Sequence, residues 1–212
     1  AGIVLFSLSF SLDLKDDISF LYGMLGRLNL QDDSTMVLQD TSIIHTGDEV
    51  RINAGYQQGT YFYVIYKGSE GEFDLLYPDN NKVVIDMTNL PDTIYATVLP
   101  WIQFNDNIGF ETFFLINSAS IQEDLISLFN SYNNVNEKGR KKLAKKIQDM
   151  IDDLNPETKQ KLASIDSRLD RPVFGGITYR GEDGDELKDV SLTHSCRGNF
   201  GIAFKKIVLN HR

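Results

Sequence analysis

Short runs in which apolar and polar residues alternate fill the first two-thirds of the sequence. In residues 3–14, every second residue from Val4 to Leu12 is apolar, and most of the residues between them are serine. Successive side chains of a strand point to opposite faces of its sheet, so this pattern predicts a strand with one buried face. Many such runs separated by turn residues are typical of an all-β sandwich or barrel.

Further runs along the chain are expected to form strands. Segment 18–30 also fits helical spacing, because three of its leucines fall on one helix face, but Gly23 and Gly26 weaken a helix and favour a strand. The run 60–67 (TYFYVIYK) is apolar on both faces, which indicates a strand buried between two layers. The expected strands are 3–14, 18–30, 49–54, 60–67, 72–77, 83–87, 94–99, 108–116, 173–180, 187–196 and 199–209.

A helical segment is expected between residues 120 and 170. Ser120 and Glu123 have the spacing of a capping box, which predicts a helix start at Ser120. Apolar residues then recur at helical spacing, and Asn155 followed by Pro156 predicts the start of a third helix. The fold class is therefore mainly β, a β-sandwich of antiparallel strands with an inserted two- to three-helix segment. We expect a single domain, 1–212, with its β core in 1–118 and 172–212 and the helical insertion in 119–171.

The charge of the chain limits its partners. It has 30 acidic and 21 basic residues and a net charge of -9, which repels nucleic-acid phosphates, so no nucleic-acid partner is expected. Its apolar stretches fall short of the roughly 20 residues that span a bilayer, so we expect no integral membrane segment. The single cysteine excludes an internal disulfide and leaves the compartment open, with an extracytoplasmic location (periplasm or cell surface) slightly favoured over the cytoplasm. The chain begins at Ala1 without a methionine, as a processed product or a piece of a longer protein would.

The most suggestive catalytic group is His194-Ser195-Cys196, because an imidazole can activate a neighbouring thiol. A protease dyad normally joins distant segments, whereas side chains two apart on one strand more often fill a core, so no catalytic residue is predicted. A metal site would need the cysteine and the three histidines to converge without any short metal-binding spacing, and neither a metal nor another cofactor is expected. The acidic loop 182–186 lacks the order of a standard calcium loop and is interpreted as a solvated hairpin tip.

Aromatic residues around one loop form the candidate binding site. Trp101 follows Pro100, with Tyr95 and Phe104 nearby, and these rings could form an exposed platform for a sugar or a peptide. Burial of the same rings in the core is the competing interpretation. A basic cluster in 138–146 is interpreted as a solvated helix face that complements an acidic protein.

The middle of the chain carries a series of structural motifs. A Thr46-Gly47-Asp48 turn precedes an aromatic strand at 61–65, a Leu-Leu-Tyr-Pro sequence at 75–78 and a strand that runs from Gly109 to Ser118. In this order, over about 43–129, the chain resembles the bacterial domain of unknown function 4384, with tyrosine at position 77 where the family has phenylalanine. Members of that family often occur beside caspase-like peptidase, protein kinase or other signalling and secretion-linked domains. The resemblance therefore implies an accessory role, and no catalytic residue carries over from it.

The leading hypothesis is a non-catalytic β-sandwich accessory module that mediates protein binding or regulation within a bacterial signalling, secretion or cell-envelope protein. Its partner would be another protein or a neighbouring domain of the same parent chain, and the sequence does not set the oligomeric state. The alternative is a glycan-binding module that uses the aromatic residues around Trp101. The weakest hypothesis is a cysteine hydrolase.

Overall fold

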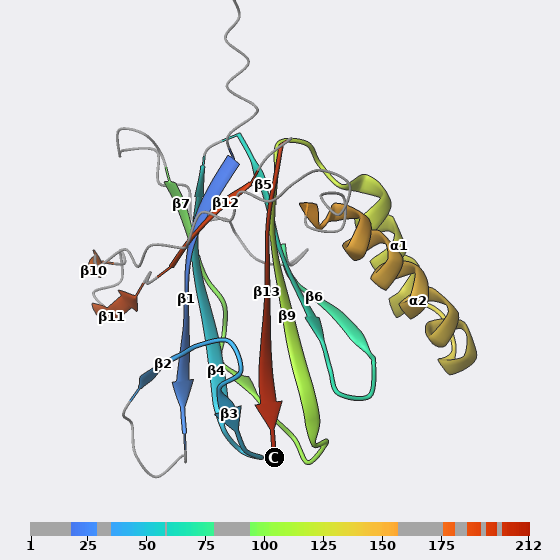
Figure 1. The fold of residues 1–212 in the computed structure, drawn as a ribbon, viewed down its shortest axis with the longest axis horizontal. Helices are drawn as coiled ribbons and strands as arrows, with labels where there is room; N and C mark the ends of the chain where they lie inside the picture. Colours follow the sequence, from blue (N-terminus) through green and yellow to red (C-terminus); the bar gives the residue numbers. More distant parts are fainter. Residues whose placement is uncertain are drawn as a thin grey trace, which may run out of the picture.

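The computed structural model describes residues 18–28, 35–57, 59–78, 94–156, 176–180, 186–191, 194–198 and 201–212, and for 94–98, 176–180 and 186–191 it describes the backbone alone. Two β-sheets pack face to face, and two helices lie along the outer side of one of them (Figure 1). The mainly β sandwich with a helical insertion that the sequence predicts is therefore confirmed.

Thirteen strands are described, and the helices fall between the ninth and the tenth of them. Segment 18–30 contains a strand, as its glycines favour. In chain order the strands are β1 (Ile18–Arg27), β2 (Met36–Leu38), β3 (Ile43–Ile44), β4 (Glu49–Gln57), β5 (Tyr61–Lys67), β6 (Phe73–Tyr77), β7 (Ile94–Val98), β8 (Ile102–Gln103), β9 (Gly109–Ser118), β10 (Gly176–Arg180), β11 (Glu186–Ser191), β12 (His194–Gly198) and β13 (Ile202–His211). The helices are α1 (Glu123–Asn133) and α2 (Glu137–Leu154).

The strands form two large sheets and one separate hairpin. The first sheet has the order β12-β1-β4-β7, with β2 paired to β1 and β8 paired to β4. The second sheet has the order β3-β13-β9-β5-β6, and β10 pairs with β11 alone. Strands β9 and β13 pair along their whole length, from Gly109 opposite His211 to Ser118 opposite Ile202. All these pairs are antiparallel except the short contact of β3 with β13.

Strand β5 separates two hydrophobic cores. Phe62 and Val64 lie in the core between the two sheets, whereas Tyr63 and Ile65 lie in the core between the second sheet and the helices. All four side chains are buried. Because each face of the strand meets a different layer, both faces must be apolar. The predicted strand between two layers is thus confirmed.

The helices cover part of the outer face of the second sheet. Leu125 and Phe129 of α1 and Ile147 and Ile151 of α2 are fully buried in the core against this sheet. Their spacing of about one helical turn places each pair on one helix face. The hydroxyl of Tyr132 in α1 accepts a hydrogen bond from the backbone N–H of Phe73 at 3.2 Å, which ties α1 to β6.

The predicted capping box at Ser120 is wrong. Helix α1 begins at Glu123, and its N-cap residue, Gln122, makes no side-chain capping bond. The Gln122 amide instead donates to Ser118 Oγ at 2.9 Å, and its backbone N–H donates to the Tyr63 hydroxyl at 2.9 Å. Hydrogen bonds to the second sheet therefore replace a local cap. Helix α2 has an ordinary cap, in which the Asn136 side chain accepts from Gly139.

Strand β6 contains a register shift that simple alternation does not predict. Simple alternation would place Phe73, Leu75 and Tyr77 on one side of this strand. The structure pairs Leu75 with Ile65 and Tyr77 with the preceding residue, Val64, so one residue of β6 bulges between them. A bulge of one residue reverses the side to which the following side chains point. Tyr77 consequently lies in the core between the sheets, while Phe73 faces the helices.

The expected single strand at 187–196 is two strands. Strand β11 pairs with β10, and β12 pairs with β1, because each half has its own partner. The expected strands at 3–14 and 83–87 lie outside the described residues, as do most of the expected third helix and residues 182–185 of the acidic loop, whose last residue, Glu186, begins β11. Among the described helices, none is both long enough and apolar enough to cross a membrane.

Candidate functional site

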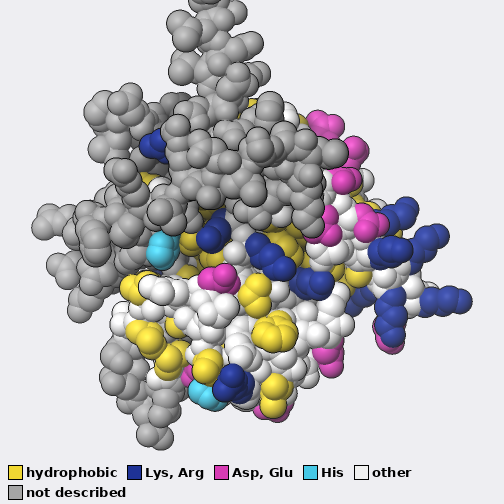
Figure 2. Space-filling model, in the orientation of Figure 1, with side chains coloured by type: hydrophobic (Ala, Val, Ile, Leu, Met, Phe, Trp, Pro, Cys, Tyr) yellow, Lys and Arg dark blue, Asp and Glu magenta, His cyan; other side chains and the backbone are white. Residues whose placement is uncertain are grey.

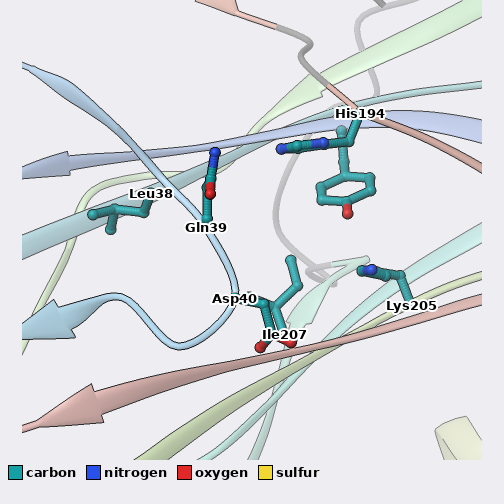
Figure 3. Close-up of a pocket in the computed structure, with 7 residues that line it drawn as sticks. Leu38, Gln39, Asp40, His194, Lys205 and Ile207 are labelled. Atoms are coloured by element: carbon teal, nitrogen blue, oxygen red, sulfur yellow. The ribbon is translucent and has the colours of Figure 1, made fainter. Parts of the chain in front are cut away.

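A cleft opens at the edge of the sandwich where the two sheets separate (Figure 3). Its volume is about 430 Å³, within the range of pockets that hold small molecules. The walls come from the first sheet, from β13 of the second sheet and from the segment that follows β2. The described lining residues are Tyr22, Leu38, Gln39, Asp40, His194, Lys205 and Ile207.

Strand pairing fixes one wall of the cleft. Tyr22 of β1 lies directly opposite His194 of β12 in the antiparallel register. Their rings lie 5.2 Å apart at an interplanar angle of 30°, so the tyrosine ring supports the imidazole. On the other wall, Lys205 and Ile207 are two residues apart on β13 and therefore share one face.

The segment after β2 closes the rim of the cleft. Asp40 Oδ1 accepts a hydrogen bond from the backbone N–H of Val208 at 2.8 Å, and the N–H of Thr41 donates to the Val208 carbonyl at 2.6 Å. These two hydrogen bonds hold the segment against the edge of β13. Leu38 precedes it and is almost fully buried, which anchors the segment in the core between the sheets.

Cys196 does not line the cleft, although His194 and Asp40 do. Its thiol is buried and donates to the backbone carbonyl of Phe204 at 3.3 Å. In this position the cysteine joins the core between the sheets and bridges β12 to β13. The geometry does not place the thiol in an open pocket with His194, and hydrolase activity stays an untested hypothesis.

A second polar site lies in the interior, at the lower end of the sandwich in Figure 1. His211 Nδ1 is 3.3 Å from Glu111 Oε1, and the hydroxyl of Tyr66 donates to Glu111 Oε2 at 2.6 Å. On the other side of the imidazole, Nε2 lies 3.3 Å from the hydroxyl of Thr46. That hydroxyl also donates to the carbonyl of Asn105 at 3.1 Å. These contacts join β5, β9, β13 and two loops.

Protons can be placed along this network. A carboxylate only accepts, so the Tyr66 hydroxyl and the His211 Nδ1–H are its donors. Burial, followed by the hydrogen bond to Glu111, raises the pKa of Tyr66 far above its ordinary value of 10.0. The neutral phenol therefore persists as a donor in the folded protein.

The order hydroxyl, imidazole and carboxylate is also that of a nucleophilic triad. The side chains of His211 and Glu111 are 0% and 2% exposed, so the imidazole cannot reach a leaving group in solution. Neither residue lines the cleft described above. We therefore interpret the network as a set of hydrogen bonds that holds the strands and loops together. A partner for His211 could not be predicted from the sequence, because the register that brings it to Glu111 depends on strands far apart in the chain.

The predicted aromatic residues do not meet on the surface. Phe104 is 4% exposed and packs against Tyr66 in the core between the sheets. Trp101 is partly buried, and the guanidinium carbon of Arg27 lies 4.1 Å from the centre of its ring. Only the backbone of Tyr95 is described, in β7. Phe104 is thus a core residue, and glycan binding at Trp101 stays a prediction.

The surroundings of Trp101 are cationic. Arg51 lies 5.6 Å from the same ring centre, and Arg27 forms an ion pair with Glu49 at 3.3 Å. Burial, and then the neighbouring Arg27, lower the pKa of Arg51. Two guanidinium groups therefore lie within cation–π distance of the Trp101 ring.

Metal ligands do not cluster in the part of the chain that the structure covers, since no group of three or more His, Cys, Asp or Glu side chains converges there. His45 lies 3.7 Å from Asp48 in the turn before β4, and His211 is held by Glu111. The basic cluster lies on α2, where Lys141 pairs with Glu137 at 3.3 Å on a solvent-exposed face.

Large apolar side chains are exposed at the lower end of the second sheet. Ile108, Phe110 and Ile43 are 67%, 66% and 43% exposed, and we name these three residues the apolar end. Phe110 lies opposite Asn210, which in turn lies opposite Ile43, so Phe110 and Ile43 lie in one row across the sheet with Asn210 between them, and Ile108 immediately precedes β9. In Figure 2, hydrophobic side chains reach the surface in the lower part of the molecule, near the lower ends of β9 and β13 in Figure 1.

The fold and these sites define the class of protein as a β-sandwich domain with a helical layer and an edge cleft. No family model, curated protein or solved structure matches the chain.

Proposed function

We propose that the chain is a non-catalytic accessory module that binds another protein, or a neighbouring domain of its parent chain, through the apolar end. The setting expected from the resemblance is a bacterial signalling, secretion or cell-envelope protein. Support comes from the exposed side chains of the apolar end and from the burial of His211, whose imidazole lies between a hydroxyl and a carboxylate.

The carrying observation is the exposure of Phe110 on a strand whose neighbouring outward residues are covered. Phe114 and Ile116 point to the same side of β9 and are buried beneath the helices. Phe110 lies at the other end of that row, where its side chain is exposed to solvent. Large apolar side chains that are exposed together at one end of a sheet are a mark of protein interaction surfaces. Burial of each by a partner would contribute about 1.5–3 kcal/mol.

Glycan binding around Trp101 is the alternative, and the geometry favours it less. Phe104 lies in the core, and Arg27 covers part of the Trp101 ring. A sugar ring needs an open aromatic face to stack upon. The apolar end offers its side chains to solvent without such cover.

The proposal can be tested by placing a photo-crosslinking phenylalanine analogue at position 110. In cells that produce the parent protein, this probe should form a discrete covalent adduct with another protein or with a neighbouring domain. The matched control is the same probe at Lys141, whose side chain is 80% exposed on α2. Equal labelling from both positions, or no adduct from position 110, would contradict the proposed interface.

A further inference from the structure

We propose that the groove between α1 and α2 docks a second copy of this chain, with the two α2 helices antiparallel across a two-fold axis. This surface belongs to the helical layer and is separate from the apolar end, so the proposal does not depend on protein binding there. The inference rests on the lining of the groove and on the distribution of charge along α2.

The groove lies on the solvent side of the two helices and has a volume of about 450 Å³. Asp124 and Leu128 line it from α1, and Lys146 and Met150 line it from α2. Each pair is four residues apart, so its two members lie on one side of their helix. Leu128 and Met150 are partly buried and give the groove an apolar surface among charged side chains.

The charge of α2 is divided between its two halves. After Glu137, every charged residue of α2 up to position 146 is basic, and every later one is acidic. In Figure 2, dark blue side chains gather at the right edge of the molecule and magenta side chains lie above them, in the region of the helices in Figure 1. Lys142, Lys146, Asp149 and Asp153 follow one another at helical spacing on one side of α2, and we name these four residues the charged stripe.

This order of charge is unfavourable for an isolated helix. A helix dipole favours acidic residues near the N-terminus and basic residues near the C-terminus, and the last turn of α2 has no basic residue. Like charges also lie four residues apart within the charged stripe, which destabilises a helix further. Among the described residues, none forms an ion pair with a member of the stripe. A partner with the reverse order of charge would compensate for both effects.

A second copy has that reverse order when its α2 runs antiparallel to the first. A two-fold axis between positions 147 and 148 places Lys146 opposite Asp149 of the second copy, and Lys142 opposite its Asp153. The same two contacts recur in the other direction, because the two copies present the same surface to each other. Leu128 and Met150 of each copy lie beside the contact, where it would remove their apolar surface from water.

The affinity of this dimer should be modest and sensitive to salt. Exposed ion pairs each contribute little and are screened by ions, and small interfaces are typical of transient complexes. We expect a dissociation constant of about 10–100 μM at low ionic strength.

Sedimentation velocity of the whole chain, from about 5 to 500 μM, measures this equilibrium. A monomer–dimer equilibrium should appear at about 0.02 M salt and weaken at least about tenfold at about 0.5 M. The salt comparison needs no variant and so does not depend on the folding of one.

Charge reversal tests the arrangement of the two helices. The double variant K142E with K146E makes the stripe wholly acidic, and D149K with D153K makes it wholly basic. Each alone should dimerise at least about tenfold more weakly, because like charges then face each other. An equimolar mixture of the two should form a heterodimer with the affinity of the unchanged chain, because every contact again joins opposite charges. The substituted residues are exposed and the new ones are good helix formers, so α2 should stay folded, as circular dichroism would show.

Two controls separate this interface from other surfaces. K141E with K145E makes the same change in net charge outside the charged stripe and should leave the dissociation constant within about twofold of that of the unchanged chain. F110S alters the apolar end and should also leave the dimer intact.

Four results would overturn the proposal. One is a monomer at every concentration at low salt. Another is equal weakening by the stripe reversals and by K141E with K145E. A third is the failure of the mixed variants to associate. The last is loss of the dimer in F110S, which would place the contact between copies at the apolar end.

Discussion

The imidazole of His211 and the carboxylate of Glu111 lie 3.3 Å apart in the interior of the sandwich, with the hydroxyl of Tyr66 on the second carboxylate oxygen. Charged groups are costly to bury unless they are hydrogen bonded, and here each carboxylate oxygen has a donor. This arrangement joins three strands of the second sheet to the turn before β4.

Replacement of Glu111 by glutamine should destabilise the fold. The substitution keeps the shape of the side chain but places an amide where two donors need an acceptor, and we expect a loss of about 3 kcal/mol in the free energy of unfolding. Urea denaturation followed by fluorescence measures this change. E49Q is the control, because Glu49 forms a partly exposed ion pair with Arg27, for which about 0–1 kcal/mol is expected. Equal effects of the two substitutions would show that the interior network contributes nothing special.

Alkaline pH should weaken the fold through Tyr66. Its pKa is raised in the folded protein, so the folded state holds the phenolic proton more tightly than the unfolded state does. The resulting stabilisation is fully present below about pH 10, the ordinary tyrosine value, and is lost as pH rises above it toward the folded pKa. The Y66F variant should therefore lose less stability between pH 9 and pH 11 than the unchanged chain. Parallel pH profiles of the two proteins would contradict this interpretation of Tyr66.

The helical layer should depend on Ile147. This side chain is fully buried between α2 and the second sheet, so I147A leaves a cavity and should cost about 2–5 kcal/mol in the free energy of unfolding. Chemical denaturation monitored by circular dichroism gives the value. K141A, on the exposed face of the same helix, should change stability by less than about 0.5 kcal/mol. If I147A lowered the free energy of unfolding no more than K141A does, the helices would not be packed against the second sheet.

Cys196 should be unreactive in the folded protein. Its thiol is buried and donates to the Phe204 carbonyl, whereas a reactive cysteine is exposed and ionised. We expect an aromatic disulfide reagent to label the native chain much more slowly than the denatured chain. Rapid stoichiometric labelling under native conditions would contradict this prediction and would support the cysteine hydrolase hypothesis.

The sequence was sufficient to predict the layers but not the sites. Period-two alternation gives the strands, and an apolar run on both faces gives β5, because these signals are local. The bulge in β6 is invisible in such a pattern, since it depends on how Tyr77 pairs with Val64. The start of α1 was missed because Gln122 is tied to Ser118 and Tyr63 rather than capped locally.

The candidate sites depend even more on distant pairing. His194 reaches the cleft because β12 pairs with β1, and the opposite wall comes from β13. In the sequence, Glu111 is part of a strand pattern and His211 is one of three scattered histidines, and no local pattern links the two residues. Their contact requires the register between β9 and β13 as well as the choice of facing sheet. A single sequence contains no direct signal for either.

The most direct test of the central claim is the affinity of the F110S variant for the partner that the crosslinking probe identifies. Loss of one buried phenylalanine should weaken binding by about tenfold or more, whereas K141S should bind as the unchanged chain does. Equal affinities of F110S and the unchanged chain, with both proteins folded, would show that the apolar end is not the binding surface.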